Sequence, residues 1–139
     1  MSQRPFKILS IEHVGVAVES MEDIFSIFSE VLGLEFSGSE EVTDQQVITD
    51  IYQIDNSKLE FLKATSLDSP IARFIEKKGR GIHHIALLVD HLRPALDYLQ
   101  EQGIKLIDEP PRIGAEGLSI AFLHPKSTGG ILVELCEKK

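Results

Sequence analysis

The stretch Ile11–Glu19 reads IEHVGVAVE, and the stretch Ile82–Asp90 reads IHHIALLVD. The two begin at positions 11 and 82, which places them 71 residues apart in a chain of 139. Both have the short apolar pattern of a β-strand, and both carry a histidine near the start. Similarity at a fixed spacing over half a chain predicts a duplicated unit. A histidine kept twice inside an apolar strand makes metal binding the first hypothesis to test.

The order of predicted elements also repeats. The first half reads as a strand, a helix and three strands, over 8–18, 20–33, 34–43, 47–54 and 58–62. The second half predicts the same order, with strands over 82–89, 105–107, 118–123 and 131–136 and a helix between Leu92 and Gly103. Ser20 is an expected N-cap, and Gly33 and Gly103 are expected helix ends.

The segment 65–80 joins the two halves, and Pro70 in it suits the first position of a short helix. No low-complexity linker separates the halves. We therefore expect one α+β domain over 1–139, built from two modules at about 8–64 and 81–137.

Strand alternation assigns the histidines to faces, because successive side chains point to opposite sides of a sheet. In the first strand the valines take the side expected to lie under a helix, and His13 takes the other. In the second strand Ile85 and Leu87 take the helix-covered side, and His84 lies opposite them. Alternation therefore selects His84 as the ligand, and His83 is expected to be a strand-end residue with a local hydrogen-bond partner.

The last strand of each module extends the repeat. The pentapeptide KLEFL from Lys58 resembles LVELC from Leu132, and each has a glutamate inside an apolar run. A buried carboxylate is expensive unless it is paired, protonated or bound to a metal. If the modules meet across a pseudo-twofold axis, two imidazoles and two carboxylates converge in a set that suits a first-row divalent ion. The four residues are His13, Glu60, His84 and Glu134.

The composition of the chain limits the kinds of partner that it is expected to bind. The formal net charge of −8 disfavours binding to nucleic-acid phosphates, and no apolar run approaches the roughly 20 residues of a membrane span. The start lacks an apolar signal core, and Cys136 is the single cysteine, so we expect a cytoplasmic protein in a reducing compartment. The cations Lys77, Lys78 and Arg80 cluster in the sequence; they are either ordinary solvated charges or a site for an anionic small molecule.

Four stretches resemble one known superfamily: 11–18, 68–74 (DSPIARF), 81–86 (GIHHIA) and 122–135 (FLHPKSTGGILVEL). They are similar to the vicinal-oxygen-chelate superfamily of paired βαβββ modules and, within it, to the methylmalonyl-CoA epimerase family. The first stretch is common in the superfamily, whereas the second and last together are more specific. The resemblance implies a curved mixed sheet around a metal site, as in glyoxalase and bleomycin-resistance proteins.

The resemblance also implies a function and its residues. It implies one divalent ion per chain (Co, Zn, Ni or Mn) on His13, Glu60, His84 and Glu134, although some relatives carry glutamine at the position of Glu60. It implies a homodimer that takes an acyl-CoA substrate and interconverts the 2R and 2S forms of methylmalonyl-CoA through an enolate. Glu134 is the candidate for both ligand and base. Some members have a further acid–base glutamate where this chain has Thr49, so the second proton-transfer group is unidentified.

The loop 124–130 (HPKSTGG) leads into the strand of Glu134. Its backbone amides, Lys126 and Ser127 are candidates for holding the substrate carboxylate or a CoA phosphate. The alternative is a glycine-rich turn between two strands.

Three other activities use the same framework. A lactoylglutathione lyase of the glyoxalase I type acts through a related enediolate, but it usually has a different ligand in the first strand. A thiol transferase for an epoxide antibiotic has two histidines and a glutamate. A non-haem iron dioxygenase uses two histidines and one carboxylate with open positions for oxygen, and an acid at Glu60 argues against it. A non-catalytic binding protein of the superfamily would typically have lost ligands.

Overall fold

In the computed structural model, which describes residues 3–138, the chain forms two compact units. One unit holds residues 13–83, and the other combines the chain up to Glu12 with the chain from His84 onward. Strands β1 (Ile8–Ala17) and β5 (Gly81–Val89) have residues in both units. The module limits expected from the repeat, 8–64 and 81–137, stay a prediction.

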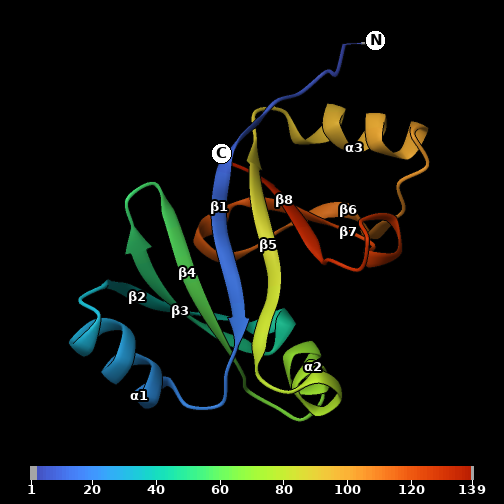
Figure 1. Cartoon of the computed structure of the whole chain (residues 1–139). Helices are drawn as coiled ribbons and strands as arrows, with labels where there is room; N and C mark the ends of the chain where they lie inside the picture. Colours follow the sequence, from blue (N-terminus) through green and yellow to red (C-terminus); the bar gives the residue numbers. More distant parts are fainter. Residues whose placement is uncertain (1–2, 139) are drawn as a thin grey trace. The chain divides into compact units, whose positions relative to one another are not determined.

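In the unit 13–83, four neighbouring strands form part of a mixed sheet (Figure 1). Their order is β2-β3-β4-β1, with β2 at Glu35–Val42, β3 at Val47–Ile54 and β4 at Ser57–Ala64. β1 and β4 are parallel, while β3 is antiparallel to both β4 and β2. The turn between β3 and β4 contains Asp55 at φ 48°, a left-handed conformation that aspartate tolerates.

One helix covers the first face of this sheet. Helix α1 (Met21–Ile24) continues directly into the π-helical stretch η1 (Phe25–Val31). The Ser20 hydroxyl caps it by accepting from the Asp23 N–H at 3.2 Å, and Gly33 follows its end at φ 82°, so the expected start and end are confirmed. Its apolar side packs on Val16 of β1, on Val18 directly after that strand, and on Tyr52 of β3 and Phe61 of β4.

A second helix packs on one part of the other face. Helix α2 (Pro70–Lys78) begins with Pro70 at its first turn, as expected, and the Ser69 hydroxyl accepts from the Ile71 N–H at 3.1 Å. Its Ile71 packs against Ala17, Val47 and Leu62. Ala17 is odd-numbered in β1, so α2 lies on the sheet face opposite to that of α1.

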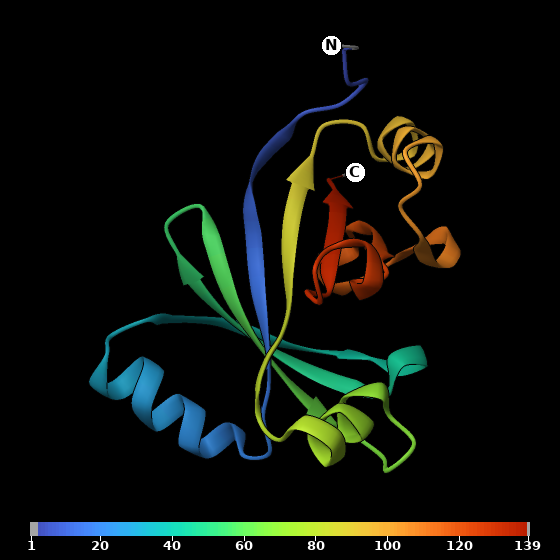
Figure 2. The same ribbon diagram turned by 45° about the vertical axis from the view of Figure 1, so that its right-hand side comes forward.

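The other unit repeats the order strand, helix, three strands (Figure 2). Its sheet runs β5-β8-β7-β6, with β6 at Leu106–Ile113, β7 at Ser119–Leu123 and β8 at Val133–Glu137. β5 and β8 are parallel, and β7 is antiparallel to β8 and β6. The α+β class and the two βαβββ modules are therefore confirmed.

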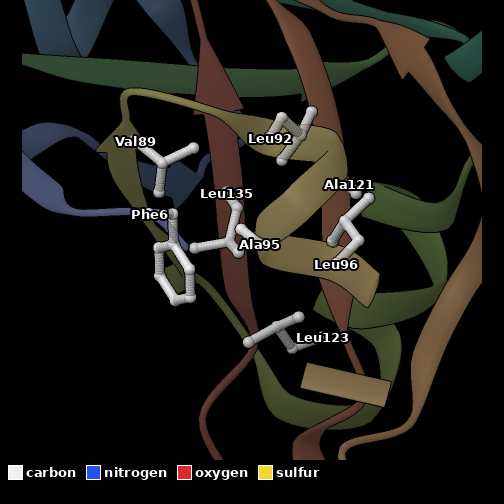
Figure 3. Packing of buried hydrophobic residues seen from close by; sticks show 8 residues of the cluster. All are labelled: Phe6, Val89, Leu92, Ala95, Leu96, Ala121, Leu123 and Leu135. Carbon is white, nitrogen blue, oxygen red and sulfur yellow. The ribbon is translucent and has the colours of Figure 1, made fainter. Parts of the chain in front are cut away.

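The core of this unit lies under helix α3 (Leu92–Glu101). Figure 3 shows α3 placing Leu92, Ala95 and Leu96 against Leu135 and the neighbouring strands. Phe6 comes from the segment before β1 and joins the same cluster. The Glu137 carboxylate accepts from the Leu92 N–H at 2.5 Å, which satisfies one of the free amides at the start of α3.

Strand β6 differs from the expectation. The sequence predicts a strand only over 105–107, and the chain continues into Pro110 and Pro111, which cannot donate to a ladder. The strand continues to Ile113 because its register with β7 breaks between Ile107 and Arg112, which takes the prolines out of the ladder. Among residues 3–138, no helix is long and apolar enough to cross a membrane.

Candidate metal centre

The first pair of candidate ligands is His13 and Glu60, both in the unit 13–83. Gly15 of β1 lies opposite Glu60 of β4 in a parallel ladder, and His13 is two residues from Gly15, so both side chains share one face. His13 Nδ1 lies 3.3 Å from Glu60 Oε2. The two residues are 4% and 3% exposed, so this pair is almost entirely shielded from solvent.

The second pair is His84 and Glu134, both in the other unit. Ala86 of β5 lies opposite Glu134 of β8, again in a parallel ladder, and His84 is two residues from Ala86. His84 Nε2 lies 3.2 Å from Glu134 Oε1, and the residues are 6% and 4% exposed. The His84 ring also meets Phe122 edge-on, with 5.7 Å between the ring centroids.

The two pairs have the same local construction. In each pair, a small residue of the parallel neighbouring strand lies opposite the glutamate: Gly15 opposite Glu60, and Ala86 opposite Glu134. The antiparallel strand on the other side places an apolar residue opposite the same glutamate: Ile51 opposite Glu60, and Phe122 opposite Glu134. The duplicated sequence therefore builds the same imidazole–carboxylate pair twice, at matching ladder positions.

The donor chemistry of these pairs fits a divalent cation. Buried carboxylates must be neutralised by a proton, a cation or a metal, and an imidazole nitrogen lies 3.2–3.3 Å from each of these two. Imidazole nitrogen and carboxylate oxygen are ligands that zinc and other first-row ions accept. Each unit by itself supplies one nitrogen and one carboxylate of such a set.

His83 has different surroundings. Its ring packs edge-on against Phe74 of α2, with 4.8 Å between ring centroids and an interplanar angle of 81°. It is half-buried, whereas the neighbouring His84 is buried. In the unit 13–83, His83 thus packs against a helix.

The loop 124–130 is held by its own hydrogen bonds. The Ser127 hydroxyl accepts from the Lys105 N–H at 3.0 Å, and the Lys126 N–H donates to His124 Nδ1 at 3.1 Å. Pro125–Ser127 forms a short 3-10 helix, and Gly129 and Gly130 follow at positive φ. Ser127 therefore has a structural role, and the exposed side chain of Lys126 is left to meet solvent or a ligand.

Thr49 lies on the same face as the first pair. It is two residues from Ile51, which faces Glu60, and it is 2% exposed. A threonine hydroxyl is not a base at neutral pH, so this position supplies no acid–base carboxylate.

Glu12, an acid that the sequence does not single out as a ligand, is 4% exposed. The sequence feature that could have identified Glu12 is an acid inside the apolar run of β1, which is also the feature that identifies Glu60 in β4. Strand alternation in β1 places Glu12 on the side opposite to His13, so the sequence does not predict it as a ligand.

This fold and these pairs define a class of protein. The chain belongs to the glyoxalase/bleomycin resistance protein/dioxygenase superfamily, whose family model matches residues 12–122.

Three similar proteins refine this assignment. The chain is 46% identical over 129 residues to an uncharacterized protein of Bacillus subtilis (strain 168), YqjC, covering 93% of this chain and 92% of that protein. It is 36% identical to the mitochondrial methylmalonyl-CoA epimerase of Dictyostelium discoideum, covering 92% and 78% of the two chains. A solved structure of a Streptomyces coelicolor methylmalonyl-CoA epimerase variant in complex with 2-nitronate-propionyl-CoA matches with a TM-score of 0.91. That match has 28% identity and covers 95% of this chain and 96% of the other.

Proposed function

We propose that this protein is a divalent-metal-dependent epimerase that interconverts the 2R and 2S forms of methylmalonyl-CoA. The observation that carries the proposal is the duplicated, buried imidazole–carboxylate pair, with contacts of 3.3 and 3.2 Å. Similarity to epimerases named for this substrate, over at least nine-tenths of the chain, supports the substrate.

We further propose that His13, Glu60, His84 and Glu134 together hold one divalent ion per chain. The repeat supports this, because pairs built alike in two related modules are suited to a shared centre. When bound, the ion supplies Lewis-acid stabilisation of charge that develops on the substrate oxygens. The identity of the ion, among Co, Zn, Ni and Mn, is a question for metal analysis.

The reaction needs a base for the proton on C2, which lies between a thioester and a carboxylate. We assign this role to Glu134, because its carboxylate is buried and the His84 ring at 3.2 Å fixes its orientation. Loss of the C2 proton leaves a planar enolate, and return of a proton to the opposite face completes the epimerisation. A second proton-transfer group is required there, and Thr49 does not provide it.

The small side chains beside the pairs suit the substrate's approach. Gly15 and Ala86 lie opposite the two glutamates and leave room at the face that carries the ligands. In the loop 124–130 the exposed ammonium of Lys126 and the hydroxyl of Ser127 are our candidates for holding the substrate carboxylate or a phosphate. The Ser127 oxygen also accepts from the Lys105 N–H, which holds the loop in place.

We propose a cytoplasmic homodimer. Cys136 is the single cysteine of the sequence, so no disulfide can form within the chain, as suits a protein of a reducing compartment. Light scattering coupled to gel filtration measures the dimer directly, with a single mass of twice the chain's 15.5 kDa expected.

A substrate panel tests the proposed function against its relatives in the superfamily. The metal-loaded protein is offered (2S)-methylmalonyl-CoA, the glutathione hemithioacetal of methylglyoxal, and fosfomycin with a thiol. We expect the 2R epimer to form from the first and no turnover of the other two. Turnover of the hemithioacetal or of fosfomycin without epimerisation would replace our proposal by a lyase or a thiol transferase.

A further inference from the structure

The strongest positive patch in the unit 13–83 lies at the end of α2. Within residues 73–80 the chain carries four cations and one acid, a local charge of +3 in a chain whose net charge is −8. The cations are all exposed: Arg73, Lys77, Lys78 and Arg80. We call these four residues the α2 cluster.

Helix α2 places this cluster at the edge of the ligand-bearing face. Ile71 of α2 packs on Ala17 and Leu62, which share a sheet face with His13 and Glu60. At about 3.3 Å per residue, the four residues from His13 to Ala17 span roughly 13 Å of β1. The cluster therefore lies beyond one end of the same face, displaced from the imidazole–carboxylate pair along the strand.

The side chains of the cluster are not committed to strong interactions. Arg80 lies 3.9 Å from Glu19, but both side chains are more than half exposed, so this ion pair contributes little. Lys78 Nζ is 6.0 Å from the centroid of the Phe74 ring, at the outer limit of a cation–π contact. Both cations can turn toward an anion at small cost.

The plain alternative is that these charges only stabilise the helix. Lys77 and Lys78 occupy the last turn of α2, where cations interact favourably with the helix dipole. The interaction with the helix dipole accounts for Lys77 and Lys78 but not for the other two cations of the cluster. Arg80 lies beyond the helix, between Gly79 at φ 81° and Gly81 at φ 151°, and Arg73 lies before the last turn.

We propose that the α2 cluster binds the phosphate groups at the nucleotide end of the acyl-CoA substrate. This inference rests on the proposed function. In an acyl-CoA the pantetheine arm separates the reacting thioester from the phosphates, so the phosphates lie away from the centre that holds the acyl group. Several exposed cations next to that face are the partners that a multiply charged phosphate group needs.

A charge reversal combined with a truncated substrate tests the proposal. The variant Lys77→Glu/Lys78→Glu is assayed with methylmalonyl-CoA and with methylmalonyl-pantetheine, which lacks the phosphates. We expect KM for the CoA substrate to rise about tenfold or more, as loss of a charge-assisted interaction predicts, with kcat kept. KM for the pantetheine substrate should stay unchanged. Added salt should raise the wild-type KM for the CoA substrate more than that of the variant.

The matched control is Arg93→Glu/Lys138→Glu, which makes the same change of charge at exposed positions of the other unit. Equal effects of the two variants, or equal effects on the two substrates, would overturn the phosphate site. Calorimetry with coenzyme A alone separates this result from the proposed function. If only Lys77→Glu/Lys78→Glu binds coenzyme A more weakly than the wild type, the phosphate site is upheld, even if the wild type epimerises neither substrate. If its affinity for coenzyme A is unchanged, the phosphate site is overturned.

Discussion

Two adjacent histidines, His83 and His84, have opposite surroundings. His84 is buried 3.2 Å from a carboxylate, whereas His83 is half-buried with its ring edge-on to Phe74. We expect His84→Ala to lower metal affinity by tenfold or more, in the range known for loss of groups at metal sites, and His83→Ala to leave it nearly unchanged. Metal content after dialysis, measured by atomic emission, checks this. Equal loss from both variants would contradict the assignment.

Tyr52 has a hydroxyl that costs stability. The residue is 0% exposed between Phe36 and Phe61, and among residues 3–138 its hydroxyl has no hydrogen-bond partner. Burial, together with the charge of Asp50, raises the pKa of the Tyr52 hydroxyl, so it stays neutral. Removing an unsatisfied buried hydroxyl should therefore stabilise the fold.

We expect Tyr52→Phe to raise the free energy of unfolding by up to about 1 kcal/mol. Urea denaturation measures this. Tyr98→Phe, at a half-buried position of the other unit, is the control that shows the ordinary effect of losing a phenol. A loss of stability in Tyr52→Phe that exceeds the loss in the control would show that the hydroxyl is satisfied.

The sequence predicted the position of single residues correctly where the two-residue alternation of a strand determines which face a side chain takes. Strand alternation selected the faces of Val16, Val18, Leu87 and Val89, and each packs with its expected helix. It failed where a partner comes from far along the chain. The bond from the Lys105 N–H to Ser127 joins residues 22 apart, and no local pattern announces it.

At the scale of elements, the segment before β1 is fastened to the end of β5. The Lys7 N–H donates to the Asp90 carboxylate at 2.7 Å, and the Asp90 N–H donates to the Lys7 carbonyl at 3.2 Å. These bonds hold Phe6 in the core under α3. The Lys7 N–H lowers the pKa of Asp90 below its usual value of 3.8, with a smaller contribution from the charge of His91.

A lowered folded-state pKa means that ionised Asp90 stabilises the fold. This contribution is complete above the unfolded pKa and is lost as the pH falls through the folded pKa. We therefore expect Asp90→Asn to be less stable than the wild type at neutral pH, with a difference that narrows below about pH 4. Urea denaturation across this range checks the sign, with Asp97→Asn on the exposed side of α3 as control. A difference that does not change with pH would contradict the linkage.

Element bounds were predictable where side chains cap the backbone. Ser20, Gly33 and Pro70 mark helix ends by their own chemistry, and the helices begin and end where these residues indicate. The length of β6 was not predictable, because the break in register that accommodates its prolines depends on the neighbouring strand β7. The π-helical stretch Phe25–Val31 was not predictable either. Its apolar residues follow the spacing of an ordinary α-helix, so the sequence predicts only a helix there.

At the scale of the whole molecule, duplication explains the chemistry. The repeat of β1 in β5 at a spacing of 71 residues, and of Glu60 of β4 in Glu134 of β8 at a spacing of 74, places the same pair of functional groups in each unit. Substrate identity is not contained in that repeat, because members of the superfamily share it. The more specific stretches 68–74 and 122–135 carried the expectation of a CoA thioester, and the relatives named above support it.

The central claim is that the protein removes and returns the proton on C2 of methylmalonyl-CoA. The most direct measurement is the exchange of that proton for deuterium, followed by NMR of the substrate with metal-loaded protein in D₂O. We predict complete loss of the C2 proton signal at a rate proportional to protein concentration. We also predict that Glu134→Gln slows this exchange by at least about a hundredfold, the usual contribution of a general base. Retention of the C2 proton by a protein with demonstrably bound metal would contradict the account.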